Sequence, residues 1–380
     1  MSSIIGYYST QFGELWKKSL FDLVKESVEG VLKENYIEMK QIDAIFFGNM
    51  LSGVLENNLH SSAKLSEIFH TNVSIFRVEA ACASGGMAFH LAKQYLDAYS
   101  NKTVLVIGAE KMTDYSPEET TDALAAAASE EEQNAGLTFP GLYALMAQAY
   151  CERYHYTEEH LAHIAFKNHY HGSLNEKAHF KNKITIEQIL KSAYVAHPLK
   201  VLDCSPISDG AAALLVTNDS KKTKHKVEIL SSEVATDVIS LKNRKDLLGL
   251  KSVRIATQKA YLQARIKPDQ VDVAELHDCF TIAEILAMED LGFWKKGSGG
   301  KMAKELVTMH GKSKKLVVNT SGGLKAAGHP VGATGVKQIG EIFLQLTNQA
   351  STRQVKSAEI GLTHNVGGSG GTAVITILRG

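Results

Sequence analysis

The sequence predicts an α/β protein built of two similar units, and two observations indicate this. Short continuous runs of Val, Leu and Ile, such as residues 103–107 and 211–217, alternate with stretches of helical hydrophobic spacing. This alternation is typical of strands that helices cover on both faces. The order of elements is also the same in both parts of the chain: strand, helix, strand, then strand, small-residue turn and long helix, then two strands. The sequence therefore predicts an internal duplication with the two long helices packed together at the centre.

The first unit is expected to span residues 1–112 and to be completed by a strand within residues 206–220, and the second to span residues 221–380. In the first unit we expect strands at residues 4–8, 44–47, 73–78 and 103–107, and helices at 15–32, 58–68 and 83–99. In the second unit we expect strands at residues 227–234, 271–276, 316–319, 360–363 and 372–378, and helices at 252–264, 281–291 and 331–346.

An insert at residues 113–205 separates the two units in the sequence. It is expected to contain helices at residues 142–154 and 157–169, and it holds seven of the fifteen histidines. Together with its lysines, these histidines predict a solvated basic face that could meet an anionic ligand. A metal site at His160 and His163 is not expected, because no carboxylate or cysteine lies at matching spacing.

Composition excludes several classes of protein. The 380 residues carry 41 basic and 41 acidic side chains, which predicts no nucleic-acid partner. No apolar run reaches the roughly 18 residues of a membrane span, and neither end carries a targeting signal that we recognise. The four cysteines have no metal-binding or redox spacing, which fits a reducing compartment. We therefore expect a cytoplasmic enzyme.

Cys82 lies where a predicted strand ends and a predicted helix begins. The first N–H groups of a helix lack intrahelical partners and its dipole is positive there, so the position favours the nucleophilic thiolate. Small residues at 84–86 would let a substrate approach the backbone closely. The alternative is a buried, unreactive cysteine, which is common.

Three further segments contain candidate catalytic residues: His-Asp-Cys-Phe at 277–280, Gly-His-Pro-Val-Gly-Ala-Thr-Gly at 328–335, and His-Asn-Val-Gly-Gly at 364–368. Three of the four segments follow predicted strands, whose carboxyl ends meet at one edge of a sheet. We therefore expect one shared pocket. The alternatives are a structural role for His329, core packing for Cys279 and an ordinary loop for the glycines.

Together with residues 108–113, 136–141 and 203–213, these segments resemble the thiolase superfamily, in the branch of sterol-carrier-protein-type and archaeal-type thiolases. The resemblance covers essentially the whole chain. It implies the thiolase fold, in which two βαβαβαββ halves stack in five layers (αβαβα) and the insert covers coenzyme A. It also implies a homodimer or a homotetramer.

The resemblance implies a role for each motif residue. Cys82 would be the nucleophile that accepts the acyl group, and His329 would take its proton. Cys279 would be the second acid/base, acting on the α-proton. His277 and His329 would form one oxyanion hole, and the N–H groups of Cys82 and Gly367 the other.

The position of the second catalytic cysteine differs from that in the better-known thiolases. In that branch the second cysteine lies in a C-terminal Cys-x-Gly, whereas this chain has Asn365 at the matching position and supplies Cys279 instead. The resemblance also implies four substrate contacts, at Ser205, Tyr143, Phe280 and Asn365.

The implied function is acyl transfer from acyl-CoA, most simply by an acetyl-CoA C-acetyltransferase that performs Claisen condensation or thiolytic cleavage. Coenzyme A thioesters would be substrates, with no metal or redox cofactor. Two alternatives stay open: an acyltransferase with a non-CoA acceptor, and an acyl-binding subunit that works with an OB-fold/zinc-ribbon partner. The presence of every candidate catalytic group argues against an inactive subunit.

Overall fold

The structure is a computed structural model that describes the chain except residues 1, 220–225 and 314. The predicted boundary between the two units, at residues 220 and 221, lies outside the described residues. No described helix is long and apolar enough to cross a membrane.

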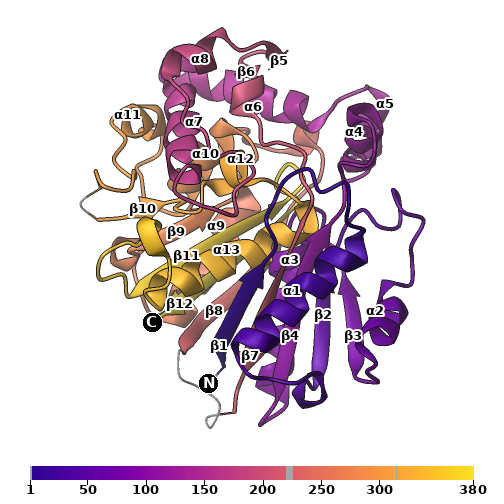
Figure 1. Cartoon of the computed structure of the whole chain (residues 1–380). Helices are drawn as coiled ribbons and strands as arrows, with labels where there is room; N and C mark the ends of the chain where they lie inside the picture. Colours follow the sequence, from indigo (N-terminus) through magenta and orange to yellow (C-terminus); the bar gives the residue numbers. More distant parts are fainter. Residues whose placement is uncertain (1, 220–225, 314) are drawn as a thin grey trace.

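One ten-stranded sheet organises the molecule, in the order β10-β9-β11-β12-β8-β1-β7-β4-β2-β3 (Figure 1). The strands of the first half are β1 (Ser3–Ser9), β2 (Ala44–Gly48), β3 (Ser74–Val78), β4 (Thr103–Glu110) and β7 (Gly210–Thr217). Those of the second half are β8 (Val227–Thr236), β9 (Val273–Leu276), β10 (Val317–Val318), β11 (Ile360–Gly367) and β12 (Thr372–Arg379).

The predicted duplication is confirmed by this strand order. Numbered along the chain within each half, the strands lie in the order 3-2-4-5-1 in both halves. The halves meet where β1 pairs with β8, at Ser3 with Glu228 and at Ile4 with Val227. The two half-sheets are thus joined along one edge rather than fully separate.

The helices produce the five expected layers. The two long helices α3 (Ser84–Ala98) and α13 (Val331–Leu346) pack on each other and contact strands of both halves, so they form the central layer. Helix α1 (Leu20–Glu34) covers the outer face of the first half, and α9 (Lys251–Ala264) covers that of the second. The other helices of the two halves are α2 (Ser61–Phe69), α10 (Thr281–Asp290), α11 (Gly299–Lys304) and α12 (Gly323–Ala327).

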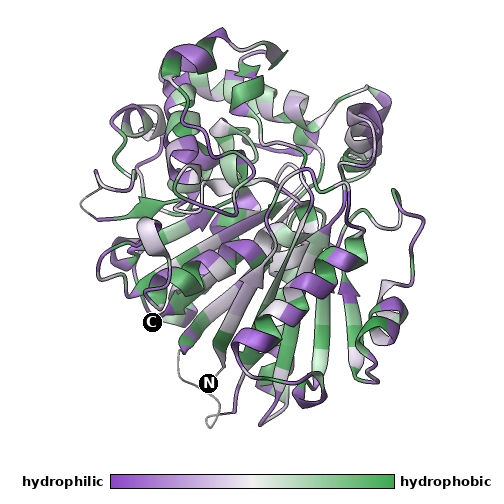
Figure 2. Cartoon of the chain, viewed as in Figure 1, coloured by the Kyte–Doolittle hydropathy of each residue, from purple (hydrophilic) through white to green (hydrophobic). Residues whose placement is uncertain are grey.

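Local sequence explains where these elements begin and what they bury. Helix α1 begins at Leu20 because Ser19 and Asp22 form a capping box, later than the hydrophobic spacing alone predicts. Figure 2 shows hydrophobic residues along the strands of the first half, whereas α1 carries both hydrophilic and hydrophobic residues. Helix α13 is buried on nearly every side, as a central layer requires.

Glycines allow the two central helices to meet backbone to backbone. A Cβ atom on Gly85 would lie 2.6 Å from the carbonyl oxygen of Gly332, and one on Gly335 would lie 2.2 Å from the amide nitrogen of Gly86. The small residues after Cys82 therefore serve helix packing. The expectation that they make room for a substrate is wrong for these two glycines of α3.

The insert contributes α4 (Pro117–Ala125), α5 (Glu130–Asn134), α6 (Phe139–Tyr154), α7 (Glu158–Gly172), α8 (Ile186–Lys191), β5 (Tyr194–Ala196) and β6 (Leu199–Lys200). It lies at the top of Figure 1, where α6 contacts α10 and α7 contacts both α10 and α12. Lys167, His169 and His171 of α7 are buried, and Lys167 is paired with Glu284. The expectation of a solvated basic face is therefore wrong for this part of the insert.

Candidate active site

The predicted motif segments converge on one site beyond the carboxyl ends of strands from both halves of the sheet. The sulfur of Cys82 and one ring nitrogen from each of His277 and His329 lie within 4.8 Å of one another, and all three residues are buried. Cys82 follows β3, His277 directly follows β9, and His329 immediately precedes Pro330, the N-cap of α13. The structure thus brings together side chains that are up to 247 positions apart in the sequence, from 82 to 329.

The loop that carries Cys82 is held in a tight conformation. Ala81 has a φ of +51°, and the hydroxyl of Ser84 accepts from the N–H of Ala80 and donates to the carbonyl of Ala81. Positive φ at a non-glycine residue persists only where the surroundings enforce it. These contacts fix the sulfur at the N-terminus of α3.

The Cys82 thiol is protonated at rest. Its side chain is only 8% exposed, and burial raises its pKa to about 12. A hydrogen bond from the N–H of Gly368 opposes this rise but does not outweigh it. The helix terminus, which favours the thiolate, is therefore outweighed by desolvation of the buried sulfur. The thiol needs a base.

His329 offers a lone pair beside this thiol. Its Nδ1 lies 2.7 Å from the hydroxyl oxygen of Thr334, which also lies 3.1 Å from the carbonyl oxygen of Pro330. A hydroxyl has one proton, and the Pro330 carbonyl can only accept it. Nδ1 of His329 therefore carries the imidazole proton and donates to Thr334. Nε2 is left with a lone pair.

His329 is also neutral at rest. Burial lowers its pKa to about 3, and the nearby ammonium of Lys337 acts in the same direction. The ring of His277 lies edge-on to it, with 5.1 Å between the ring centroids. Burial, followed by the neighbouring imidazoles of His329 and His364, keeps the pKa of His277 well below its usual range.

Cys279 reaches the same site from the end of β9. Burial, followed by the nearby Cys82, raises the pKa of its thiol well above the usual value, so this thiol too is protonated at rest. The hydroxyl of Tyr143 donates to the Gly368 carbonyl at 3.2 Å and lies within hydrogen-bonding reach of the Cys279 sulfur. The ring of Tyr143 packs on that of Phe280, with 4.7 Å between centroids.

Two other predicted residues lie beside these groups. The N–H of Ser205 donates to the carbonyl of Cys279 at 2.9 Å, which fixes the loop that carries Ser205. A Cβ atom on Gly367 would lie 2.4 Å from the carbonyl oxygen of Ala80, so Gly367 packs against the Cys82 loop. The backbone amides that face the Cys82 sulfur are those of Gly368 and of Cys82 itself.

Asn365 does not face open space. Its side chain is buried, and its amide group contacts Gly86, Cys82 and His277. A direct substrate contact, which the resemblance implied, is not what this arrangement favours.

Comparison with known proteins agrees with this geometry. Residues 2–220 match the family model "Thiolase, N-terminal domain", and residues 234–380 match "Thiolase C-terminal domain-like". The chain belongs to the thiolase family. It is an acyltransferase of the thiolase type.

Several thiolase relatives align over nearly the whole chain. Two proteins named acetyl-CoA acetyltransferase, from Methanothermobacter thermautotrophicus and Methanocaldococcus jannaschii, are 41% and 43% identical over 380 and 387 residues; each alignment covers 99% of this chain and 98% of the relative. Sterol carrier protein 2 from Rattus norvegicus is 33% identical over 377 residues, covering 94% of this chain and 67% of the relative.

Two solved structures share the thiolase fold with this chain. The Ltp2-ChsH2(DUF35) aldolase superposes with a TM-score of 0.82 at 19% identity, covering 99% of this chain and 97% of that one. Human mitochondrial 3-ketoacyl-CoA thiolase superposes with a TM-score of 0.73 at 16% identity, covering 100% and 98%.

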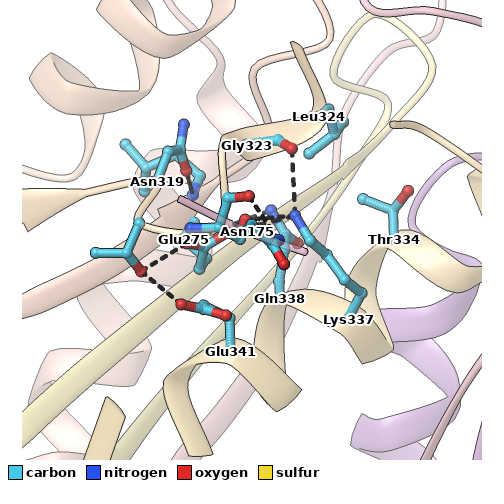
Figure 3. Close-up of polar contacts among 12 residues, drawn as sticks. Asn175, Glu275, Asn319, Gly323, Leu324, Thr334, Lys337, Gln338 and Glu341 are labelled. Carbon is cyan, nitrogen blue, oxygen red and sulfur yellow. Dashed lines mark hydrogen bonds and ion pairs between the residues drawn. The ribbon is translucent and has the colours of Figure 1, made fainter. Parts of the chain in front are cut away.

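A buried polar network supports the segments of this thiolase that carry His277 and His329 (Figure 3). The ammonium of Lys337, on α13, donates to the hydroxyl of Ser321 and the carbonyl of Gly323, and lies 3.6 Å from a carboxylate oxygen of Glu275. Glu275 is in β9, two residues before His277, and accepts hydrogen bonds from the N–H and the hydroxyl of Ser321. The network therefore ties the strand that carries His277 to the helix that follows His329.

Replacing Lys337 should be costly for stability. In Lys337→Met the Glu275 carboxylate stays buried without its cation, and such a loss typically costs about 3–5 kcal/mol. We expect the urea midpoint of unfolding to fall accordingly. The matched control is Lys301→Met, which removes an exposed lysine 3.9 Å from Glu305 and should leave the midpoint unchanged. Equal midpoints for both variants would contradict a supporting role for the network.

Proposed function

We propose that this thiolase is an acetyl-CoA C-acetyltransferase that joins two acetyl-CoA molecules, or cleaves the product, through an acyl group on Cys82. The observation that carries the proposal is the clustering of Cys82, His277 and His329 within 4.8 Å, with Cys279 beside them. The two archaeal relatives at 41% and 43% identity support acetyl-CoA as the substrate. Incubation of the purified protein with acetyl-CoA, followed by detection of acetoacetyl-CoA and coenzyme A, tests it.

The first half-reaction transfers the acetyl group to the enzyme. Nε2 of His329 takes the proton of Cys82 as the sulfur attacks the thioester carbonyl, and the C–S bond to coenzyme A breaks. The Cys279 thiol, protonated at rest, donates its proton to the leaving CoA thiolate. The enzyme then holds an acetyl thioester at Cys82, an imidazolium at His329 and a thiolate at Cys279.

The second half-reaction forms the carbon–carbon bond. The Cys279 thiolate removes an α-proton from a second acetyl-CoA, and the enolate oxygen accepts hydrogen bonds from His277 and His329. The α-carbon attacks the acetyl group on Cys82, whose sulfur leaves and regains its proton from His329. All three groups return to their resting forms, so no metal or redox cofactor is required.

A cleft of about 540 Å³ adjoins the Cys82 loop and gives a substrate room to enter. Its lining includes Ala81 and Gly368, which flank the sulfur, and the apolar side chains of Met50, Leu51 and Ala127. We propose that one of the two acyl-CoA substrates approaches Cys82 through this cleft, with the insert over its nucleotide end. A cytoplasmic location is also part of the proposal and is supported by the four unpaired cysteines.

We further propose a homodimer formed across β3. This strand lies at the end of the sheet order, and an unpaired edge is a template for another chain. Phe76 in this strand is 45% exposed and stacks on Phe46, and Leu91 and Tyr99 of the adjoining α3 region are also exposed. Such aromatic and aliphatic side chains are typical anchors of an interface.

Phe76→Lys should therefore weaken self-association. Losing an interface anchor typically costs about 2 kcal/mol or more, so we expect the dimer dissociation constant to rise by about 30-fold or more. Sedimentation equilibrium measures this change. Leu262→Lys replaces a residue of α9 that is 80% exposed and should leave the association constant unchanged. A dimer that resists Phe76→Lys would place the interface elsewhere.

A partner protein is a separate possibility that one comparison favours. One of the two solved structures with the same fold, the Ltp2-ChsH2(DUF35) aldolase, is named for a DUF35 component as well as for Ltp2. Condensation by the purified chain alone would show that no partner is needed for the reaction. Acetylation without condensation, restored by adding an OB-fold protein, would support the partner.

A further inference from the structure

Asn365 occupies a buried position next to the end of β11, between the Cys82 loop and His277. Asn365 is 1% exposed, and its side-chain amide is hydrogen-bonded to the backbone of Gly86 and Cys82 and to the ring of His277. The side chain therefore acts on the reaction only through its neighbours, and the question is what it does to them.

Two backbone groups fix the orientation of the Asn365 amide. The N–H of Gly86 lies 3.1 Å from Oδ1, and the carbonyl oxygen of Cys82 lies 3.1 Å from Nδ2. A backbone N–H can only donate and a carbonyl can only accept. Turning the amide over would set two donors against each other and two acceptors against each other. Oδ1 must therefore face Gly86, and Nδ2 must face Cys82.

This orientation determines the proton position on His277. The second N–H of Nδ2 points to Nδ1 of His277, at 3.2 Å. A ring nitrogen that accepts a hydrogen bond carries a lone pair, so the proton of the neutral ring lies on Nε2. Because Nδ1 is occupied by Asn365, Nε2 is the nitrogen that remains for the reacting groups.

We propose that Asn365 is a positioning residue that holds His277 in the Nε2–H tautomer, which makes His277 a permanent hydrogen-bond donor and prevents the site from binding a soft metal ion. The claim that His277 is a hydrogen-bond donor rests on the proposed function, because the acceptor would be the substrate oxygen. The claim about metal binding does not rest on the proposed function.

The three side chains of the site show how the His277 tautomer controls metal binding. A cysteine sulfur and two imidazole nitrogens within 4.8 Å are ligands that Zn²⁺ and Co²⁺ bind tetrahedrally. A metal ligand must offer a lone pair. Nε2 of His329 offers one, whereas Nε2 of His277 carries a proton as long as Asn365 donates to its Nδ1. The native site thus offers two ligands instead of three.

Asn365→Asp reverses the tautomer with almost no change in shape. The carboxyl oxygen that replaces Nδ2 keeps its proton for the Cys82 carbonyl, and its lone pair accepts a hydrogen bond from Nδ1–H of His277. The Nε2 lone pair of His277 would then turn toward Cys82 and His329. We expect the variant to bind Co²⁺ with a thiolate-to-cobalt absorption band that native protein lacks. We expect its condensation rate to fall by about 10²–10³, the usual cost of one oxyanion-hole donor.

The matched control is Asn175→Asp. The side chain of Asn175, labelled in Figure 3, also bridges a carbonyl and an N–H, donating to Ser321 and accepting from Lys177, and among the described residues neither of these partners is a histidine. This control should not gain the cobalt band. Adding Cys82→Ala to Asn365→Asp should abolish the band, because the sulfur ligand is gone.

A measurement on native protein decides the proposal even if Asn365→Asp fails to fold. Nitrogen-15 chemical shifts of His277 should show a protonated Nε2 and an unprotonated Nδ1. A proton on Nδ1 in native protein would overturn the proposal, as would a folded Asn365→Asp with an unchanged tautomer. Neither readout depends on turnover, so failure of the proposed acetyl-CoA reaction would leave this test intact.

Discussion

The Cys279→Ala protein is expected to accept an acetyl group on Cys82 and then stop. Acylation requires the Cys82 sulfur and the lone pair of His329, and both are present in this variant. The proton that Cys279 gives to the leaving CoA thiolate can come from water instead, because a thiolate leaves readily without prior protonation. Condensation requires a base for the α-proton, and Asn365 is a neutral amide that cannot take it. Loss of a general base typically lowers a rate by about 10²–10⁴. The variant should therefore complete acylation of Cys82 but not the condensation that follows.

Radiolabelled acetyl-CoA measures both halves in one sample. Protein-bound label reports acylation, and labelled acetoacetyl-CoA reports condensation. Cys151→Ala, which alters a half-buried cysteine in α6, is the control and should perform both steps. Normal condensation by Cys279→Ala would remove Cys279 from the mechanism. Failure to acylate would show that its proton is already essential in the first step.

The His329→Ala protein is expected to lose acylation itself, with a characteristic pH dependence. Native Cys82 and His329, with pKa values of about 12 and about 3, are both neutral between about pH 5 and 9, so native acylation should vary little there. Without His329 only the thiolate fraction reacts. That fraction rises tenfold per pH unit below the thiol pKa.

Single-turnover acylation at several pH values tests this expectation. At neutral pH the variant should be slower by at least about 10²–10⁴, and the deficit should shrink as pH rises. His310→Ala, which removes a half-buried histidine outside the site, is the control and should retain the native profile. A flat pH profile for His329→Ala would show that another group takes the thiol proton.

The sequence predicted the convergence of the motifs because the positions and ends of the strands are encoded locally. Continuous hydrophobic runs identified most strands, and the repeated order of elements along the chain implied the duplication. Cys82 and His277 each follow such a strand, so their meeting at one edge of the sheet followed from topology.

Other properties could not be predicted because they depend on partners distant in the chain. The thiol pKa of Cys82 is set by burial under segments such as Gly367 and Gly368, about 285 residues away. Gly85 allows close packing of α3 on α13 because it lies against the backbone of Gly332, which is far from it in the sequence. The role of Asn365 depends on which backbone groups face its two amide atoms, and no local pattern contains that information.

Intact-protein mass spectrometry after a short incubation with acetyl-CoA tests the central claim most directly. Proteolysis and fragment sequencing then locate the added group, and Cys82→Ala provides the comparison. The expected result is one acetyl group per chain, attached to Cys82, that coenzyme A removes and that the Cys82→Ala protein never acquires. An acetyl group on Cys151, Cys204 or Cys279 instead, or acetoacetyl-CoA formation by the Cys82→Ala protein, would contradict the account.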